Sequence, residues 1–215
     1  MYAKYFKRVI DFSLSLIALI LLLPVLLVIA LLVRINLGAP VVFKQDRIGL
    51  HEQIFTMYKF RTMTDQRDSN GNLLPDEKRR TKLGNILRST SMDELPELIN
   101  ILKGDLAIVG PRPLLVSYLP YYTEEERKRH TVRGGLTQPE VLYGLVNPTW
   151  DEQFKYEIEY AKNVTFLTDV QIIWSTIAIL FKRVETDYGT VVRNPLDVER
   201  ANKGGMEVDS CDTSA

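Results

Sequence analysis

The chain has 215 residues, enough for one domain with a hydrophobic core and short appendages. Its 27 Lys and Arg residues balance its 27 Asp and Glu residues, so no overall positive charge would attract nucleic acid, and no nucleic-acid partner is expected. The single cysteine, Cys211, excludes an intrachain disulfide framework and indicates a reducing compartment, so the active part of the chain is expected in the cytosol.

A continuous apolar run extends from Phe12 to Val33. As one straight helix it would reach about 33 Å, close to the hydrocarbon thickness of a bilayer. Basic residues precede the run, as they do in a signal peptide. However, the run is longer than a typical signal-peptide core, and the following Leu37-Gly38-Ala39 is a poor cleavage site. The segment is therefore expected to stay in the membrane.

The membrane segment could cross the bilayer or enter and return. The positive-inside rule expects basic residues at one end of a spanning helix, whereas here they flank both ends. Pro24 lies near the middle of the run, where it removes a backbone hydrogen bond and predicts a kink. Both features favour a re-entrant helix-break-helix over residues 1–34, although a spanning helix also tolerates proline. The flanking basic residues are Lys4, Lys7, Arg8, Arg34, Lys44 and Arg47.

A β-hairpin is predicted directly after the membrane segment. Two short β-prone runs, Val41–Gln45 and Gln53–Arg61, lie on either side of a turn near Gly49. The segment Asp65–Glu77 is polar and contains an Asn-Gly pair, which predicts a loop.

A helix with clear start and stop residues is predicted from Asp93. Asp93 is a good N-cap, and Pro96 falls in the first turn, where a backbone N–H is not needed. Gly104 is placed to end the helix. The apolar residues expected on one face are Leu95, Leu98, Ile99 and Leu102.

The rest of the chain is predicted to be mainly helical after a short strand at Leu106–Val109. Charged helices are expected at Thr123–His130 and Trp150–Lys162. The apolar stretch Phe166–Val184 contains polar interruptions, so it is either an amphipathic helix on the bilayer surface or an ordinary core helix. The predicted fold is thus α+β and mostly helical, with a cytosolic or interfacial domain over residues 35–185 and a polar, mobile tail over 186–215.

Asp93 and Glu94 are the first candidates for chemistry. Adjacent carboxylates at the start of a helix lie where the backbone N–H groups and the helix dipole favour negative charge. The same run, Ser91 to Glu94, also matches the S-x-x-E capping box, which is a purely structural device. The two interpretations differ in whether cations and a substrate gather around the pair.

Four cations can be grouped with the acidic pair: Lys59, Arg61, Arg88 and Arg112. Lys59 and Arg61 alternate at strand period and are expected on one face. Arg112 lies between two prolines that restrict its backbone, and a rigid guanidinium suits a bidentate grip on phosphate. Carboxylates ringed by cations beside a membrane anchor predict phosphoryl chemistry on a lipid substrate. Asp93 and Glu94 are also suited to hold Mg²⁺.

Other kinds of catalytic site are disfavoured. The chain has two histidines, His51 and His130, and no nearby cysteine, which argues against a zinc site or a Cys/His nucleophile pair. Neither a P-loop nor a dinucleotide-binding glycine motif is present in the sequence.

Several motifs in order resemble the monotopic phosphoglycosyl transferases, bacterial sugar transferases, in their small minimal-domain form. The resemblance extends from about Tyr5 to Val184. It is carried by Phe6–Asp11, Phe43–Gly49, Tyr58–Met63, Arg88–Leu98, Leu102–Asp105 and Gly110–Pro113.

The resemblance implies a re-entrant helix broken near Pro24 and a two-step reaction. Asp93 would attack the β-phosphate of a UDP-sugar, expel UMP and hold the phospho-sugar covalently until undecaprenyl phosphate accepts it. Glu94 would hold Mg²⁺ or manage protons, and Arg112 would contact the nucleotide-sugar.

The resemblance also implies a place in the cell. The chain would be monotopic in the bacterial inner (cytoplasmic) membrane, with its catalytic domain on the cytosolic face and in contact with membrane lipid. It would open surface glycan assembly and pass its product to downstream glycosyltransferases.

Two departures from the family pattern motivate other hypotheses. Leu23 stands where the family often has serine, and the segments Arg133–Val141 and Leu145–Trp150 differ from the usual pattern near the expected nucleotide-sugar pocket. One alternative is an inactive membrane relative that binds polyprenyl lipid or scaffolds glycan enzymes. Another is hydrolysis of the activated phospho-sugar. The sequence leaves the identity of the sugar open.

Overall fold

The computed structural model describes residues 1–145, 148–183 and 193–204. A π-helical turn, η1 (Tyr2–Phe6), leads into the long helix α1 (Lys7–Leu37). Over Tyr2–Leu37 the most apolar window has a mean hydropathy of 3.5, and most of that window is not covered by the rest of the protein. Within the described residues, this is the one helix long and apolar enough to cross a membrane.

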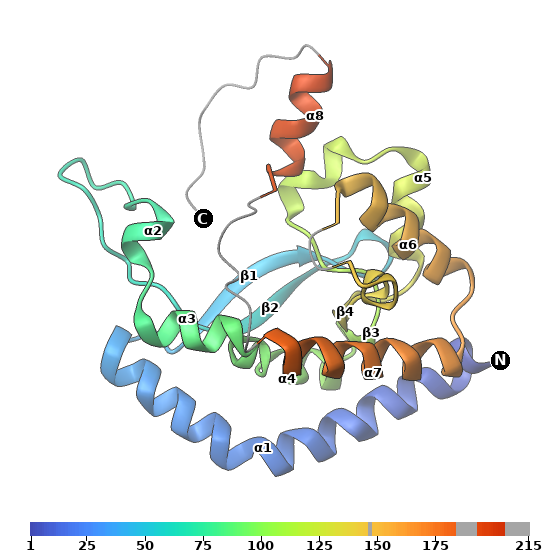
Figure 1. The fold of residues 1–215 in the computed structure, drawn as a ribbon, viewed down its shortest axis with the longest axis horizontal. Helices are drawn as coiled ribbons and strands as arrows, with labels where there is room; N and C mark the ends of the chain where they lie inside the picture. The colour runs from blue at the N-terminus through green and yellow to red at the C-terminus, as the bar shows by residue number, and fades with distance from the viewer. Residues whose placement is uncertain (146–147, 184–192, 205–215) are drawn as a thin grey trace.

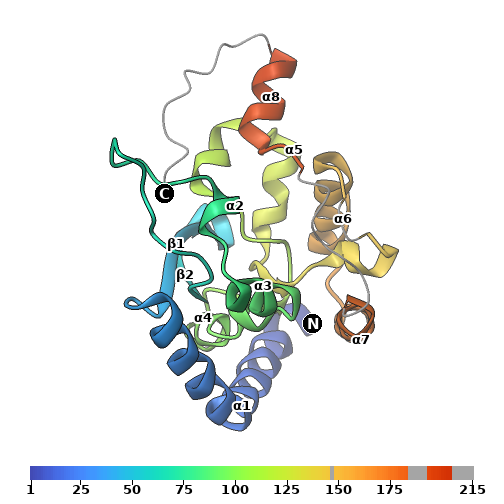
Figure 2. The ribbon, with the colours of Figure 1, turned by 60° about the vertical axis from the view of Figure 1, so that its left-hand side comes forward.

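Pro24 lies inside α1, and the helix continues through it. The helix axis changes direction near its middle, so that two arms rise toward the rest of the molecule (Figures 1 and 2). The predicted kink is therefore a bend in a continuous helix rather than a break between two helices. A proline removes one backbone hydrogen bond, and the neighbouring turns keep theirs.

Both arms of α1 contact the same side of the globular part. Near its beginning, Arg8 Nη2 donates to the carbonyl of Leu102 at 2.9 Å, and the backbone N–H of Ile108 donates to Asp11 Oδ1 at 3.3 Å. Near its end, Val33 is buried with Phe60 in one hydrophobic cluster. The two ends of the apolar helix are thus held on one face of one body (Figure 1).

Two small sheets form the β structure. Strands β1 (Val42–Ile48) and β2 (Ile54–Phe60) make an antiparallel hairpin, which confirms the prediction and extends its first strand. A second, parallel pair consists of β3 (Ala107–Val109) and β4 (Gly135–Thr137). Strand β4 was not predicted. A Cβ at Gly135 would lie 2.0 Å from the backbone nitrogen of Gly110, so glycine is what permits this pairing.

Helices supply most of the remaining structure. The 3-10 turns are η2 (Leu50–Glu52), η3 (Met92–Glu94), η4 (Val116–Tyr121), η5 (Lys128–Thr131) and η6 (Pro139–Tyr143). The α-helices are α2 (Asp76–Arg79), α3 (Lys82–Ser89), α4 (Glu97–Lys103), α5 (Glu124–Arg127), α6 (Trp150–Lys162), α7 (Phe166–Arg183) and α8 (Leu196–Gly204).

The predicted helices are recovered with some differences in extent. Helix α6 has the predicted bounds, and the expected Thr123–His130 helix divides into α5 and η5. Gly104 ends α4 in the left-handed conformation, as predicted. Ile99 is exposed instead of joining the apolar face, because α4 buries Leu98 and Ile101.

The C-terminal segment differs from the expected mobile tail over residues 193–204. Leu196 is fully buried in the largest hydrophobic cluster, beside Trp150 and Tyr118. Arg200 Nη2 also pairs with Glu126 Oε1 at 2.5 Å. The other parts of that predicted tail, 186–192 and 205–215, lie outside the described residues.

Helix α7 presents a broad apolar surface to the outside. Trp174 is 73% exposed, and Phe166 and Leu167 are also exposed, whereas Ile172 faces the core and is fully buried. Helices α4 and α7 lie on the side of the domain that faces α1 (Figure 1). The exposed apolar face of α7 fits the predicted surface helix better than an ordinary core helix.

Candidate active site

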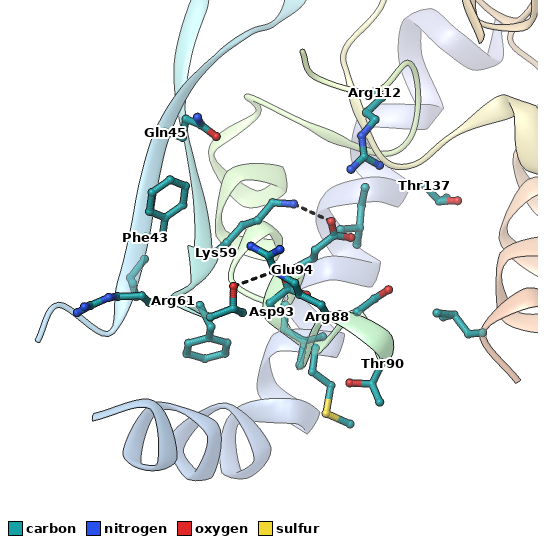
Figure 3. A pocket seen from close by; sticks show the side chains of 18 of the residues that line it. Phe43, Gln45, Lys59, Arg61, Arg88, Thr90, Asp93, Glu94, Arg112 and Thr137 are labelled. Atoms are coloured by element: carbon teal, nitrogen blue, oxygen red, sulfur yellow. Dashed lines mark hydrogen bonds and ion pairs between the residues drawn. The ribbon is translucent and has the colours of Figure 1, made fainter. Parts of the chain in front are cut away.

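A cavity of about 1210 Å³ opens between the β1–β2 hairpin, η3, the Pro111–Pro113 loop, β4 and α7. The six residues singled out from the sequence all line it: Lys59, Arg61, Arg88, Asp93, Glu94 and Arg112. They come from four separate parts of the chain, and all but Arg61 lie around the same space (Figure 3).

The acidic pair lies on a tight turn before α4, not at the start of that helix. Ser91 adopts a left-handed conformation, with φ of 55°, and leads into the 3-10 turn η3 that contains Asp93 and Glu94. Pro96 precedes α4 as its N-cap. Asp93 is therefore not the predicted N-cap, because the left-handed turn at Ser91 delays the regular helix. The Ser91 side chain makes no capping hydrogen bond, so the capping-box interpretation does not explain this pair.

Asp93 is a partly buried carboxylate with charges of both signs nearby. Burial raises its pKa, the Glu94 carboxylate raises it further, and the charges of Lys59 and Arg88 oppose the rise. A carboxylate that is poorly solvated and more basic than usual is a better nucleophile than one free in water. The environment of Asp93 therefore suits attack on an electrophilic phosphorus.

Lys59 bridges two carboxylates across the cavity floor. Its Nζ lies 2.6 Å from Glu94 Oε1 and 3.3 Å from Glu97 Oε1. Glu97 is 3% exposed, and burial raises its pKa to about 7, against the opposing charge of Lys59. Sequence reasoning missed Glu97, because an acid in the first turn of a helix looks like an ordinary dipole-stabilising residue.

The side chains of Arg88 and Arg61 have different partners and point in different directions. The Arg88 Nε donates to Thr62 Oγ1 at 2.9 Å, which holds this side chain close enough to Asp93 to affect its pKa. Arg61 donates to the carbonyl of Ala39 at 3.0 Å and pairs with Asp65 at 2.7 Å. Its guanidinium points away from the acidic pair (Figure 3). Arg61 thus orders the loops at the cavity mouth.

Arg112 lies on the opposite side of the cavity, with its backbone held and its side chain exposed. The Arg112 N–H donates to Glu157 Oε1 at 2.7 Å, and its carbonyl accepts from Arg129 Nη2 at 2.5 Å. Arg129 and Glu157 also pair with each other at 2.6 Å and are 1% and 0% exposed. The Arg112 guanidinium points into the cavity toward Lys59 and Glu94 (Figure 3). Among the described residues it makes no ion pair.

The site offers limited protein ligands for a metal. No group of three or more His, Cys, Asp or Glu side chains that could hold a metal occurs in the described part of the chain. Asp93 and Glu94 nevertheless supply adjacent carboxylate oxygens, and Mg²⁺ is commonly held by one or two carboxylates together with substrate phosphates and waters. The donor set therefore fits Mg²⁺ when a substrate phosphate completes it.

The region that departs from the family pattern forms part of the cavity wall. Thr137, Gln138 and Val141 line the cavity from β4 and η6, opposite the hairpin. Residues 146 and 147 of this region lie outside the described residues. Leu23 lies within α1, 50% exposed, and makes no contribution to the cavity.

Comparison with known proteins agrees with this geometry. A model of the bacterial sugar transferase family matches residues 2–183. The chain is 44% identical over 199 residues to the sugar transferase EpsL of Bacillus subtilis (strain 168), covering 93% of this chain and 96% of the relative.

Two further relatives carry names that specify their substrates. The UDP-glucose:undecaprenyl-phosphate glucose-1-phosphate transferase of Klebsiella pneumoniae is 35% identical over 80% of this chain. The UDP-N-acetylgalactosamine-undecaprenyl-phosphate N-acetylgalactosaminephosphotransferase of Aeromonas hydrophila is 33% identical over 80% of it. The matched regions cover 39% and 43% of the lengths of these relatives, respectively.

Proposed function

Because this chain belongs to the bacterial sugar transferase family, we propose that it transfers a sugar 1-phosphate from a UDP-sugar to undecaprenyl phosphate and releases UMP. The observation that carries the proposal is the position of Asp93 in a cavity that also holds Lys59, Arg88 and Arg112. The names of two relatives specify a UDP-sugar and undecaprenyl phosphate, which supports the same substrate classes here.

The first step would form a covalent intermediate on Asp93. A carboxylate oxygen of Asp93 attacks the β-phosphorus, the bond from that phosphorus to the bridging oxygen breaks, and UMP leaves with the bonding electrons. Arg88 and Lys59 lie beside the attacking group, and their positive charge would stabilise the charge that develops on the transferred phosphoryl group.

The second step would regenerate the enzyme. A phosphate oxygen of undecaprenyl phosphate attacks the phosphorus of the aspartyl phospho-sugar, the bond to Asp93 breaks, and the lipid diphosphate sugar is released. Glu94, which pairs with Lys59, would assist proton movement or hold Mg²⁺ together with Asp93. A bound Mg²⁺ would neutralise phosphate charge.

The membrane arrangement proposed here is monotopic. Both ends of α1 contact one side of the domain, which supports a re-entrant helix that enters and leaves on the cytosolic face of the bacterial inner membrane. The exposed apolar face of α7 would rest on the same membrane surface. This arrangement would bring the cavity close to a lipid acceptor and make the reaction the first membrane step of surface glycan assembly, before downstream glycosyltransferases.

The topology can be tested by cysteine labelling. With Cys211→Ser as background, Tyr2→Cys and Asn70→Cys are expected to react with an impermeant thiol reagent from the same side of sealed vesicles. Labelling from opposite sides would establish a spanning helix and refute the re-entrant arrangement.

The reaction can be tested with the purified full chain, Mg²⁺, undecaprenyl phosphate and a panel of UDP-sugars. UMP release is expected with at least one donor, and Asp93→Asn should abolish it. Asp76→Asn is the matched control, because Asp76 is an exposed acid on the rim of the same cavity. Mass spectrometry of protein quenched with donor alone should show the phospho-sugar on Asp93. Near-normal turnover of Asp93→Asn would end the covalent proposal.

A second candidate function rests on the altered cavity wall from η6 and β4. If that wall prevents donor binding, the chain is an inactive relative that binds polyprenyl lipid or scaffolds glycan enzymes. Lipid association without any binding of nucleotide-sugar would favour this function. UMP release that does not depend on the lipid acceptor would instead indicate hydrolysis.

A further inference from the structure

Arg47 is a cavity residue whose charge has no carboxylate partner among the described residues. It lies near the end of β1 and lines the cavity. Its Nη2 donates to Gln45 Oε1 at 2.5 Å, and its Nη1 is 3.5 Å from the carbonyl of Pro113, which is at the limit of a hydrogen bond. Two other arginines of low exposure are paired: Arg129 with Glu157 and Arg61 with Asp65.

One donor of Arg47 is buried without a partner. Among the described residues, the Nε of Arg47 has no hydrogen-bond partner, which is rare for a buried polar atom in a folded protein and destabilises the ligand-free site. Arg47 is thus incompletely satisfied within the protein, and an anion bound to its guanidinium from the cavity would offset part of this destabilisation.

Arg47 also lies near Arg112, which makes no ion pair within the described part of the chain. Burial, followed by the neighbouring charge of Arg112, lowers the pKa of Arg47 to about 10, and the charge of Glu97 opposes this fall. The backbone next to Arg47 is tied to the loop that carries Arg112, because the Ile48 N–H donates to the carbonyl of Leu114 at 3.1 Å. Two like charges held near one another repel, and a bound anion would offset this repulsion.

The reaction geometry identifies which anion fits. In an in-line displacement the leaving group departs from the side of the phosphorus opposite the attacking oxygen. Arg112 and Gln45, the partner of Arg47, lie across the cavity from Asp93 (Figure 3). A donor attacked by Asp93 at its β-phosphorus would thus direct its α-phosphate toward the two arginines.

We propose that Arg47 binds, together with Arg112, the α-phosphate of the uridine nucleotide, the group that leaves as UMP. This assignment rests on the proposed function. Arg47 lowers the energy of the departing phosphate and acts on the side of the cavity opposite Asp93 and Arg88.

Binding of UMP and uridine to the solubilised full chain tests the assignment without turnover. Arg47→Gln is expected to weaken UMP binding roughly 10- to 100-fold, the effect of losing a charged hydrogen bond, and to leave uridine binding unchanged. The matched control is Arg67→Gln, because Arg67 is exposed in the loop after β2 and does not line the cavity. It should bind UMP as the unmodified chain does.

Thermal unfolding separates ligand binding from a structural role. Because the unligated site leaves Arg47 poorly satisfied, Arg47→Gln should keep or raise the melting temperature of the ligand-free chain and reduce the increase caused by UMP. A lower melting temperature with unchanged UMP affinity would overturn the assignment and leave the proposed function standing. An unmodified chain that bound no uridine nucleotide would overturn both.

Discussion

The two sides of the cavity differ in how their positive side chains are paired. On the η3 side, Lys59 pairs with both Glu94 and Glu97. On the opposite side, the guanidinium of Arg112 has no carboxylate partner in the described structure, and the protein holds only its backbone. On the side that would perform the attack, Lys59 is already paired with carboxylates, whereas on the side that would meet the leaving phosphate Arg112 makes no ion pair among the described residues. A substrate anion can therefore bind Arg112 without displacing the carboxylates that pair with Lys59.

The largest effect is expected from breaking the buried pair behind Arg112. Arg129→Met leaves Glu157 buried without its partner, which should lower the free energy of unfolding by about 3–5 kcal/mol. Denaturant unfolding at neutral pH measures this. Lys128→Met is the control, because its partner Glu125 is exposed and such surface pairs contribute about 0–1 kcal/mol. Equal losses in the two variants would show that the buried pair is not the support of the Arg112 loop.

The second-largest effect is expected from a change on the η3 side of the cavity. Lys59→Met removes the positive charge shared by Glu94 and Glu97, so catalytic efficiency should fall roughly 100-fold, a typical cost of removing one electrostatic stabiliser. Burial raises the pKa of Asp93, and Lys59 opposes that rise, so the acidic limb of the pH–rate profile should also move to higher pH.

The matched control for that experiment is Lys103→Met, since Lys103 bonds the Tyr58 hydroxyl at the end of α4 and does not line the cavity. A pH–rate profile of Lys59→Met that keeps its acidic limb would contradict the electrostatic role of Lys59.

The smallest effect is a pH dependence of stability from Glu97. Its pKa of about 7 in the folded chain exceeds its ordinary value of 4.5, because burial disfavours the charged form. The contribution of protonated Glu97 to the free energy of unfolding is fully present below about pH 4.5. It is lost as the pH rises through about 7. Glu97→Gln should flatten this fall, which is on the order of 1–3 kcal/mol. Unfolding followed from pH 4 to 8 measures it.

Glu152→Gln is the control, because the contribution of Glu152 to stability depends on pH in the opposite direction. The Thr149 backbone and side chain lower the pKa of Glu152, so its stabilising contribution is present at neutral pH and is lost as the pH falls. A pH dependence of the same slope in both variants would show that Glu97 is not the source.

The sequence by itself determined the elements that depend on local pattern. Continuous apolar composition set α1, alternating residues and a glycine turn set the β1–β2 hairpin, and Gly104 set the end of α4, because each needs interactions only within a few neighbouring residues. The grouping of the six candidate residues in one cavity also followed from ordered motifs.

Tertiary structure decided what depends on distant partners. Strand β4 exists because Gly135 can approach Gly110, and α8 because Leu196 completes a core built by residues far earlier in the chain. The direction of Arg61 and the fixed backbone of Arg112 likewise depend on atoms well separated in sequence. Local propensity carries no information about such contacts, since their free energy appears only when burial brings the partners together.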